Sequence, residues 1–530
     1  MKRAGAAAGA GAIGSLPGCC PRPPLYNLGF PQFEYVVVLM MENRAFDNLL
    51  GFTYDPAELP PGVDYQGVVG RNLSNPIPPY ADQFERGVVP VMPGMVYDNP
   101  NPDPGEPYPH VNTQLFGTVL PESNRYKDSL SMEAPFNLPD PVPFPPPMNG
   151  FVVDYINNFV NINGRQPTYD EYKVIMECYP REALPVMNTL ARQFAVCDHW
   201  HCAVPSQTFC NRSFFHAGRS AGFVTNAPYQ KWIFDNNGET IFNRIEECGG
   251  FDLSWRIYFD PQDIVSLTAL IHFPVLRPYF RSRIRTMDRF YDDVRTGCLP
   301  RYSFIEPRLL FNHNDMHPPV KIFGHTQPSS ILPGEVLINN IYEAIRRSDS
   351  PLGNNFRNTL FVVTFDEHGG CYDHVPPPPG IPPDESAPPG QMDFRFDRLG
   401  VRIPTIFVSA FIDAGTIINT PLHHNSLLRT LSQKWGLGHL TERDRTATDL
   451  SGIFNRSSPR PRDEWPVITP LPIPPDVEAA SLQDRDLNDL QRGIVGLVAA
   501  IDGDEPPAIT GVNEALEYIR NRAGGLFDVP

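Results

Sequence analysis

Residues 34–41, Glu-Tyr-Val-Val-Val-Leu-Met-Met, form an apolar run that leads directly into the polar pair Glu42-Asn43. Residues 359–365, Thr-Leu-Phe-Val-Val-Thr-Phe, repeat the arrangement and lead into Asp366-Glu367-His368-Gly369-Gly370. Continuous apolar runs of this kind are typical of strands that are buried on both faces of a parallel sheet. Residues 401–408 predict a further strand, in which Pro404 indicates an edge or irregular position.

Amphipathic helical patterns lie between these strands, at residues 184–194, 335–347 and 426–435. Buried strands that alternate with such helices predict an α/β fold, with helices on both faces of a mostly parallel sheet. In these folds ligands bind outside the carboxyl ends of the strands. The two polar clusters that follow the strands are therefore expected to meet at one edge of the sheet.

The composition limits the classes of partner. The chain has 530 residues with a formal net charge of −17, which argues against a nucleic acid or an anionic membrane as its main partner. The densest apolar run is far shorter than the roughly 18 residues of a membrane span. We expect a soluble protein without integral membrane association, and the choice between cytoplasm and secretion stays open, as does the oligomeric state. The nine cysteines form no Cys-x-x-Cys pair, and we expect buried free thiols between residues 178 and 210.

The polar clusters predict a metal site. Three carboxylates, from Glu42, Asp366 and Glu367, would converge with the amide of Asn43 and repel one another, which a divalent cation would relieve. Oxygen donors favour a hard ion, Ca²⁺, Mg²⁺ or Mn²⁺, although Fe and Zn stay open.

A second motif lies at residues 205–212, Pro-Ser-Gln-Thr-Phe-Cys-Asn-Arg, where a helix is expected to begin. The N–H groups and the positive dipole end of a helix favour a phosphate and activate a nearby hydroxyl. An isolated Ser-x-Thr is more often a helix cap or turn. These residues alone do not choose between Ser206 and Thr208.

Three segments then carry a resemblance: residues 42–47, Glu-Asn-Arg-Ala-Phe-Asp; residues 205–212; and residues 364–376, Thr-Phe-Asp-Glu-His-Gly-Gly-Cys-Tyr-Asp-His-Val-Pro. With a lesser match at 424–429, the sequence resembles the phosphoesterase family, which contains bacterial and plant phospholipases C and an acid phosphatase branch. The resemblance covers roughly residues 34–455. It implies an alkaline-phosphatase-like three-layer sandwich, with long loops over the site, that hydrolyses phosphate esters.

The resemblance also implies roles for individual residues. The metal ligands would be Glu42, Asn43, Thr208, Asp366 and Glu367, and Thr208 would be the nucleophile. His110, His317 and His424 would act in catalysis. Asn211, Arg212, His368 and His374 would bind the substrate, although for Arg212 a structural ion pair is the alternative. The sequence departs from the family pattern at Ala45, Asn48 and His423, where serine, histidine and aspartate are usual, and Asp413 or another acid would have to replace the last.

The expected domain organisation has three parts. Residues 1–30 are rich in alanine and glycine and are expected to form a disordered tail. Residues 31–460 would form the phosphoesterase catalytic domain, in which the stretches 53–110 and 136–148 are ordered loops over the site. Residues 461–530 would be a proline-rich extension with helices at 482–501 and 512–522 that packs on this domain.

The leading interpretation is a metal-dependent, phospholipase C-like phosphodiesterase that acts on a phospholipid or another phosphate ester through a threonine nucleophile. An acid phosphatase acting on monoesters is the alternative, and a non-catalytic lipid-binding relative is a further one. A sulfatase would need a Cys/Ser-x-Pro-x-Arg motif, and none surrounds Thr208.

Overall fold

The fold is described from a computed structural model of the chain. It describes residues 30–84, 87–248, 254–310, 312–319, 321–322, 325–326, 330–475, 487, 489–509 and 511–527. Apart from Phe30, the tail predicted for residues 1–30 lies outside the described residues.

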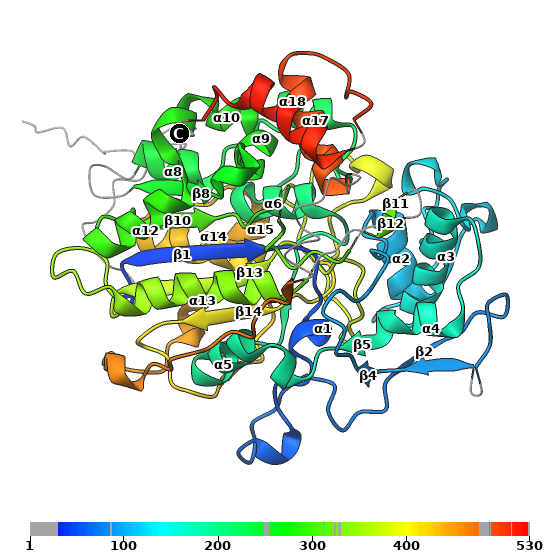
Figure 1. Ribbon diagram of the computed structural model, residues 1–530, viewed down its shortest axis with the longest axis horizontal. Coiled ribbons are helices and arrows are strands. Elements are labelled where there is room, and N and C mark those ends of the chain that lie inside the picture. The colour runs from blue at the N-terminus through cyan, green and yellow to red at the C-terminus, as the bar shows by residue number, and fades with distance from the viewer. Residues whose placement is uncertain are drawn as a thin grey trace, which may run out of the picture.

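An eight-stranded sheet forms the centre of the molecule (Figure 1). In spatial order its strands are β15 (Thr416–Ile418), β6 (Ala195–Cys197), β14 (Thr405–Val408), β13 (Thr359–Phe365), β1 (Tyr35–Met41), β10 (Tyr302–Ile305), β8 (Trp255–Phe259) and β9 (Ile284–Thr286). Neighbouring strands are parallel except at β14, which runs antiparallel to both β13 and β6. The predicted α/β fold with a mostly parallel sheet is confirmed.

The two apolar runs of the sequence are the neighbouring central strands β1 and β13. They pair in register from Tyr35 opposite Thr359 to Met41 opposite Phe365, and every residue of both strands is buried. Because the strands end at the same level, the N–H of Asp366 donates to the carbonyl of Met41 over 3.1 Å. The polar residues that follow each strand therefore start side by side.

Of the two positions that Pro404 indicated for the strand at 401–408, edge or irregular, the edge position is wrong. β14 begins at Thr405, after the proline, and pairs on both sides. Pro404 lies outside the ladder, so its missing N–H costs no strand hydrogen bond.

Helices cover both faces of the sheet. On one face α13 (Leu332–Arg347) packs against α5 (Pro185–Gln193) and α12 (Met287–Thr296). A second group consists of α6 (Thr208–Ala217), α8 (Ile241–Cys248) and α14 (His424–Trp435), with α6 in contact with the other two. Figure 1 shows α13 in front of the sheet and α14 behind it.

Most of the chain between α1 (Phe46–Leu50) and α5 forms a lobe beside the sheet, at the right of Figure 1. Its elements are β2 (Ser74–Pro76), β3 (Val88–Pro90), β4 (Met92–Pro93), α2 (Tyr108–Phe116), α3 (Phe151–Asn163), α4 (Tyr169–Tyr172) and β5 (Glu177–Cys178). The lobe has its own apolar core, in which Val111 and Leu115 of α2 meet Phe151 and Ile156 of α3. The long stretches expected to be loops contain only short elements.

At the C-terminal end, α17 (Asp489–Ile501) packs against α7 (Tyr229–Asp235) and α9 (Leu267–Ile271), and α18 (Val512–Ala523) packs on α17. The first residues of the helix expected at 482–501 lie outside the described part, and the boundary at residue 460 stays a prediction. Cys178, Cys197, Cys202 and Cys210 are buried free thiols, as expected. Among the described residues, no helix combines the length and apolar character needed to span a membrane.

Candidate active site

Four of the five expected metal ligands meet at the carboxyl ends of β1 and β13. The N–H of Asn43 donates to Asp366 Oδ1 over 3.2 Å, and the side chains of Glu42, Asn43, Asp366 and Glu367 are fully buried. Asn43 has φ of +56°, in the left-handed region that asparagine tolerates better than most residues. This conformation turns the chain sharply after β1.

Three oxygens of this group find no hydrogen-bond partner among the described residues: Asn43 Oδ1, Asp366 Oδ2 and Glu367 Oε1. Burial raises the pKa of Asp366 and raises those of Glu42 and Glu367 well above their ordinary values. Buried oxygens without partners are costly, and a hard divalent cation is the partner that such donors suit. The residues present therefore fit a divalent metal.

Thr208 is the first residue of α6, and its hydroxyl donates to Glu42 Oε2 over 3.2 Å. One turn later, Arg212 Nε donates to Glu42 Oε1 over 3.0 Å, and it lies 3.8 Å from Asp366 Oδ2. All of these side chains are buried. Arg212 thus forms ion pairs with the carboxylates of Glu42 and Asp366, one turn after the hydroxyl at the helix N-terminus.

The other residues of this motif face elsewhere. The hydroxyl of Ser206 donates to the carbonyl of Val224 and does not contact the carboxylates. The amide of Asn211 accepts from the N–H of Val204 over 2.9 Å and donates to the carbonyl of Ser206 over 2.7 Å. Asn211, an expected substrate contact, therefore holds the loop that precedes α6.

His317 joins the cluster from the other side. Its Nε2 lies 2.9 Å from Asn43 Nδ2 and 3.5 Å from Glu106 Oε1, and its Nδ1 lies 4.0 Å from Asp103 Oδ1. Burial alone would lower the pKa of His317, but the charges of Asp103 and Glu106 outweigh it and hold this pKa well above its ordinary value. The neighbouring acids therefore favour the protonated form of His317, beside the expected ligands.

Asp103 and Glu106 were missed by the sequence analysis. Glu106 also accepts a hydrogen bond from Asn43 Nδ2 over 2.5 Å, and both acids are buried. With His317 they form a group whose ligand atoms all lie within 4.8 Å of one another. The only signal was a pair of acids in the turn-like Asp103-Pro-Gly-Glu106, within a proline-rich stretch that lacks any period.

A hydrogen-bonded chain extends from the lobe to His368, which lies beside the expected ligand Glu367. His110 Nδ1 lies 2.8 Å from Asp154 Oδ1, and Gln114 donates to Asp154 Oδ2 over 2.8 Å. The other end of the Gln114 amide lies 2.8 Å from His368 Nε2, whose Nδ1 is 3.3 Å from Glu367 Oε2. Burial lowers the pKa of His368 to about 3, so this ring is neutral. His110 and His368 therefore belong to one network, which ends beside the expected ligand Glu367.

His424, an expected catalytic residue, is buried against the backbone of Asp366. Its Nε2 is 2.6 Å from the carbonyl of Asp366, its Nδ1 accepts from Trp200 Nε1 over 3.4 Å, and burial lowers its pKa to about 4. Asp413, proposed to orient His424, instead pairs with Arg456 over 2.5 Å. That expectation is wrong, because backbone and indole groups hold the ring.

His374 belongs to a separate ionic group. Its Nδ1 lies 2.6 Å from Asp47 Oδ2, and the buried Arg402 binds Asp47 over 2.9 Å and Asp373 over 2.9 Å. This group ties the segment after β13 to α1 (Phe46–Leu50). Its geometry gives His374 no contact with the ligand oxygens.

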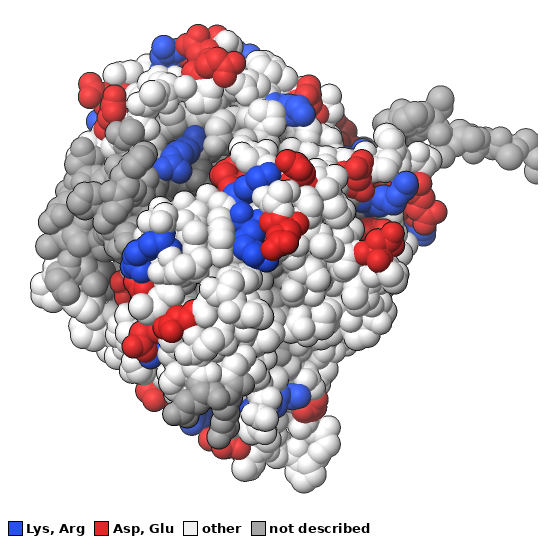
Figure 2. Space-filling model, turned by 90° about the vertical axis from the view of Figure 1, so that its right-hand side faces the viewer, with Lys and Arg blue, Asp and Glu red and all other residues white. Residues whose placement is uncertain are grey.

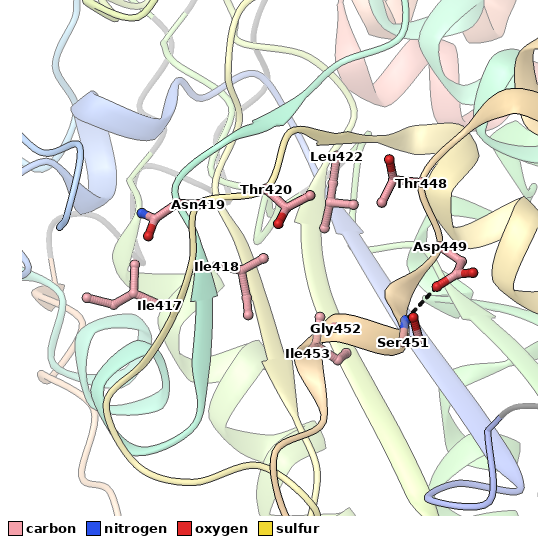
Figure 3. Close-up of a pocket in the computed structure, with 10 residues that line it drawn as sticks. All are labelled: Ile417, Ile418, Asn419, Thr420, Leu422, Thr448, Asp449, Ser451, Gly452 and Ile453. Atoms are coloured by element: carbon pink, nitrogen blue, oxygen red, sulfur yellow. Dashed lines mark hydrogen bonds between the residues drawn. The ribbon is translucent and has the colours of Figure 1, made fainter. Parts of the chain in front are cut away.

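A surface pocket of about 550 Å³ lies elsewhere, beside the edge strand β15 (Figure 3). Ile417, Asn419, Asp449 and Ser451 are among the residues that line it, and none of the expected site residues does. The volume of this pocket is therefore no evidence that it takes part in chemistry at the carboxyl edge of the sheet.

The protein thus has an α/β fold, and its site combines buried carboxylates that fit a divalent cation with a hydroxyl at a helix N-terminus. The model of the Phosphoesterase family matches residues 33–438. Non-specific phospholipase C3 of Arabidopsis thaliana is 33% identical over 493 residues, covering 88% of this chain and 82% of the relative. The chain belongs to the Phosphoesterase family.

More distant similarities are also found. Phospholipase C B of Mycobacterium tuberculosis is 25% identical over 522 residues, covering 89% of this chain and 88% of the relative. Among solved structures, a protein in the alkaline phosphatase superfamily from Vibrio parahaemolyticus matches with 12% identity and a TM-score of 0.30. The match covers 56% of this chain and 78% of the chain of that structure.

Proposed function

We propose that this chain is a metal-dependent phospholipase C that cleaves a phospholipid on the glycerol side of its phosphate, with Thr208 as the nucleophile. The names of the relatives, phospholipases C of plants and a mycobacterium, support the substrate class. The observation that carries the proposal is the Thr208 hydroxyl, which lies 3.2 Å from Glu42 among buried ligand oxygens without partners.

The proposed metal ligands are Glu42, Asn43, Thr208, Asp366 and Glu367. Their oxygen donors favour Ca²⁺, Mg²⁺ or Mn²⁺. A bound cation would neutralise phosphate oxygens and lower the pKa of a hydroxyl in contact with it.

In the first step, Thr208 Oγ1 forms a bond to phosphorus while the bond from phosphorus to the diacylglycerol oxygen breaks. The hydroxyl proton passes to Glu42 Oε2, the acceptor of its hydrogen bond, and His317 donates a proton to the departing oxygen. The N-terminus of α6 and Arg212 stabilise the charge on the phosphoryl oxygens.

In the second step, water attacks the phosphothreonine diester. Its proton goes to His317, which was left neutral, and Thr208 Oγ1 regains its proton from Glu42. The products are diacylglycerol and a phosphorylated head group, and the side chains return to their starting protonation states. His110 and Asp154 are proposed to hold the lobe side of the site in place through Gln114 and His368.

Thr208→Val tests the proposal, because it keeps the side-chain shape and removes the oxygen. Diacylglycerol release from phosphatidylcholine should fall by several orders of magnitude, on the scale of a lost nucleophile. Ser206→Ala is the matched control, because its hydroxyl is committed to the carbonyl of Val224, and it should retain most activity. Equal activity of Thr208→Val and the parent would refute the nucleophile.

The same assay separates the alternatives. After removal of bound metal, each divalent ion is added back, and phosphatidylcholine and p-nitrophenyl phosphate are offered in parallel. Hydrolysis of the monoester alone would instead assign an acid phosphatase. Binding of phosphatidylcholine without hydrolysis under all metals would assign a lipid-binding relative.

A further inference from the structure

Residues 118–149 form one long excursion, here called the strap, between α2 and α3. It leaves α2 at Gly117 and returns to α3 at Gly150. The two ends touch: a Cβ on Gly150 would lie 1.8 Å from the carbonyl oxygen of Thr113 and 2.8 Å from the Cα of Gly117. Only glycine fits at this position, so the strap is closed at its base.

The strap is fastened to the part of α2 that carries His110. Asn137 Nδ2 donates to the carbonyl of Pro109 over 3.1 Å, and Asn112 Nδ2 donates to the carbonyl of Phe136 over 2.9 Å. The helices at its base also hold the buried pair of His110 and Asp154. The strap is therefore attached directly to the helices that contribute side chains to the site.

The surface of the strap is unusually apolar. Phe144 is 70% exposed, Leu130 is 62% exposed and Val142 is 45% exposed. Most of the exposed large apolar side chains of the described residues fall between residues 84 and 144. Exposed apolar side chains gathered in one part of a fold mark interaction sites.

Residues 141–147, here called the apolar loop, have the sequence Pro-Val-Pro-Phe-Pro-Pro-Pro. The loop has no charged or hydrogen-bonding side chain, and all of its residues except Pro146 are exposed. Because proline has no N–H, Val142 and Phe144 provide its only backbone donors. Few polar groups would lose water if this loop entered an apolar phase, which lowers the cost of burial.

The charges nearby give no attraction to an anionic surface, since the strap carries the acids Asp128 and Asp140 in addition to its ion pairs. On the strap, Arg125 pairs with Glu122 over 3.1 Å and Lys127 pairs with Glu133 over 3.2 Å. Figure 2 shows the side of the molecule that bears the lobe, where acidic and basic groups alternate between wide uncharged areas and form no basic patch. With a net charge of −17, the chain is poorly suited to an anionic membrane.

We propose that the apolar loop inserts into the surface of a zwitterionic phospholipid bilayer and seats the site on its lipid substrate. The role of this contact in substrate access rests on the proposed function, but binding to the membrane can be measured without any hydrolysis of substrate. Docking through apolar side chains depends on buried area and little on ionic strength.

The test is sedimentation with phosphatidylcholine vesicles at low and high salt. The double variant Val142→Ser, Phe144→Ser should bind about tenfold more weakly than the parent, because two partly exposed apolar side chains no longer enter the bilayer. Leu352→Ser is the matched control. Leu352 is 98% exposed in the turn before β13, at the end of this strand opposite to the carboxyl end where the site lies. Its loss should leave vesicle binding unchanged. Parent binding should differ little between the two salt concentrations.

Hydrolysis of p-nitrophenyl phosphocholine, a soluble diester, separates docking from catalysis. The double variant should retain parental rates on this substrate and lose activity on vesicles. A parent that binds vesicles but hydrolyses neither substrate would refute the proposed function and leave the docking proposal standing. Vesicle binding equal to that of the parent in the double variant would overturn the docking proposal, as would parent binding only to anionic vesicles.

A second variant reports on the contact directly. Phe144→Trp should show a blue shift of its fluorescence on addition of phosphatidylcholine vesicles, whereas Leu352→Trp should not. Equal responses from the two tryptophans would also overturn the proposal.

Discussion

The two oxygens of Asp366 have different surroundings. Oδ1 accepts from the N–H groups of Asn43 and Glu367 over 3.2 and 2.7 Å, whereas Oδ2 has no hydrogen-bond partner among the described residues. The first oxygen fixes the carboxylate, and the second is left to face the ligand cluster. This division is what a fixed metal ligand requires.

Asp366→Asn should therefore remove the stabilisation by metal. At a concentration of about 100 times Kd, a bound ion stabilises a fold by about 2.7 kcal/mol, which appears as a rise in melting temperature. We expect this rise in the parent, to be measured by differential scanning fluorimetry, and its loss in Asp366→Asn. Asp413→Asn, which changes a half-exposed carboxylate paired with Arg456, should respond to metal as the parent does. Unchanged metal content in Asp366→Asn would refute the ligand assignment.

His317 leads to a prediction about the leaving group. If its imidazolium protonates the departing alkoxide, His317→Asn should lower diacylglycerol release by roughly 10²–10⁴-fold. p-Nitrophenolate leaves without a proton, so the first step with p-nitrophenyl phosphocholine, seen as the burst of p-nitrophenolate, should slow far less. Pre-steady-state rates of leaving-group release by the parent and the variant on both substrates measure this difference, and equal losses on the two would rule out the role as an acid.

At this scale the sequence predicted some residues and missed others for a physical reason. Glu42 and Asp366 follow periodic buried strands, so their meeting point could be predicted from strand pairing. Glu106 reaches the same cluster from an irregular loop, whose path depends on tertiary contacts and not on any local pattern. Arg212 could be recognised as a partner of anions, but only its position shows that it binds Glu42.

Among the helices, the contact between α5 and α13 has a buried carboxylate at its centre. Glu335 of α13 accepts from the N–H groups of Val186 and Met187, at the N-terminus of α5, over 2.6 and 2.8 Å. Burial raises the pKa of Glu335 from 4.5 to about 8, even though these hydrogen bonds lower it. The folded state thus holds a proton that the unfolded chain releases near its ordinary pKa.

It follows that this group stabilises the fold fully below about pH 4.5, and that its contribution is lost as the pH rises to about 8. Glu335→Gln cannot titrate, so the difference in melting temperature between parent and variant should narrow across this range. Glu343→Gln, on the same helix but paired with Arg347 near the surface, should follow the pH trend of the parent. A constant difference between parent and Glu335→Gln from pH 5 to pH 8 would contradict the assignment.

Strand order is another property of elements that the sequence could not give. The apolar run at 405–408 predicted a strand, but its antiparallel place between β13 and β6 depends on where the chain returns to the sheet. From the sequence alone, a proline just before a strand cannot be distinguished from a proline within the strand. The helices at 184–194, 335–347 and 426–435 followed from their period and match α5, α13 and α14 within a few residues.

On the scale of the whole molecule, the sheet is only one wall of the site. The lobe contributes His110, Asp154 and Gln114 from α2 and α3, together with Glu106 from the loop before them. Because the lobe has its own core, it can carry the strap without disturbing the sheet. The α/β sheet could be predicted from its period, whereas this lobe, rich in proline and short of periodic patterns, could not.

The central claim is that Thr208 becomes covalently bound to the phosphoryl group, and acid quenching of the metal-loaded enzyme during turnover of phosphatidylcholine tests it most directly. Trypsin cleavage after Arg192 and Arg212 would release both candidate hydroxyls in one peptide, and fragmentation by mass spectrometry separates them. The account predicts a phosphocholine adduct on Thr208, absent from Thr208→Val and present in Ser206→Ala. An adduct on Ser206, or hydrolysis of a substrate chiral at phosphorus with inversion, would contradict it.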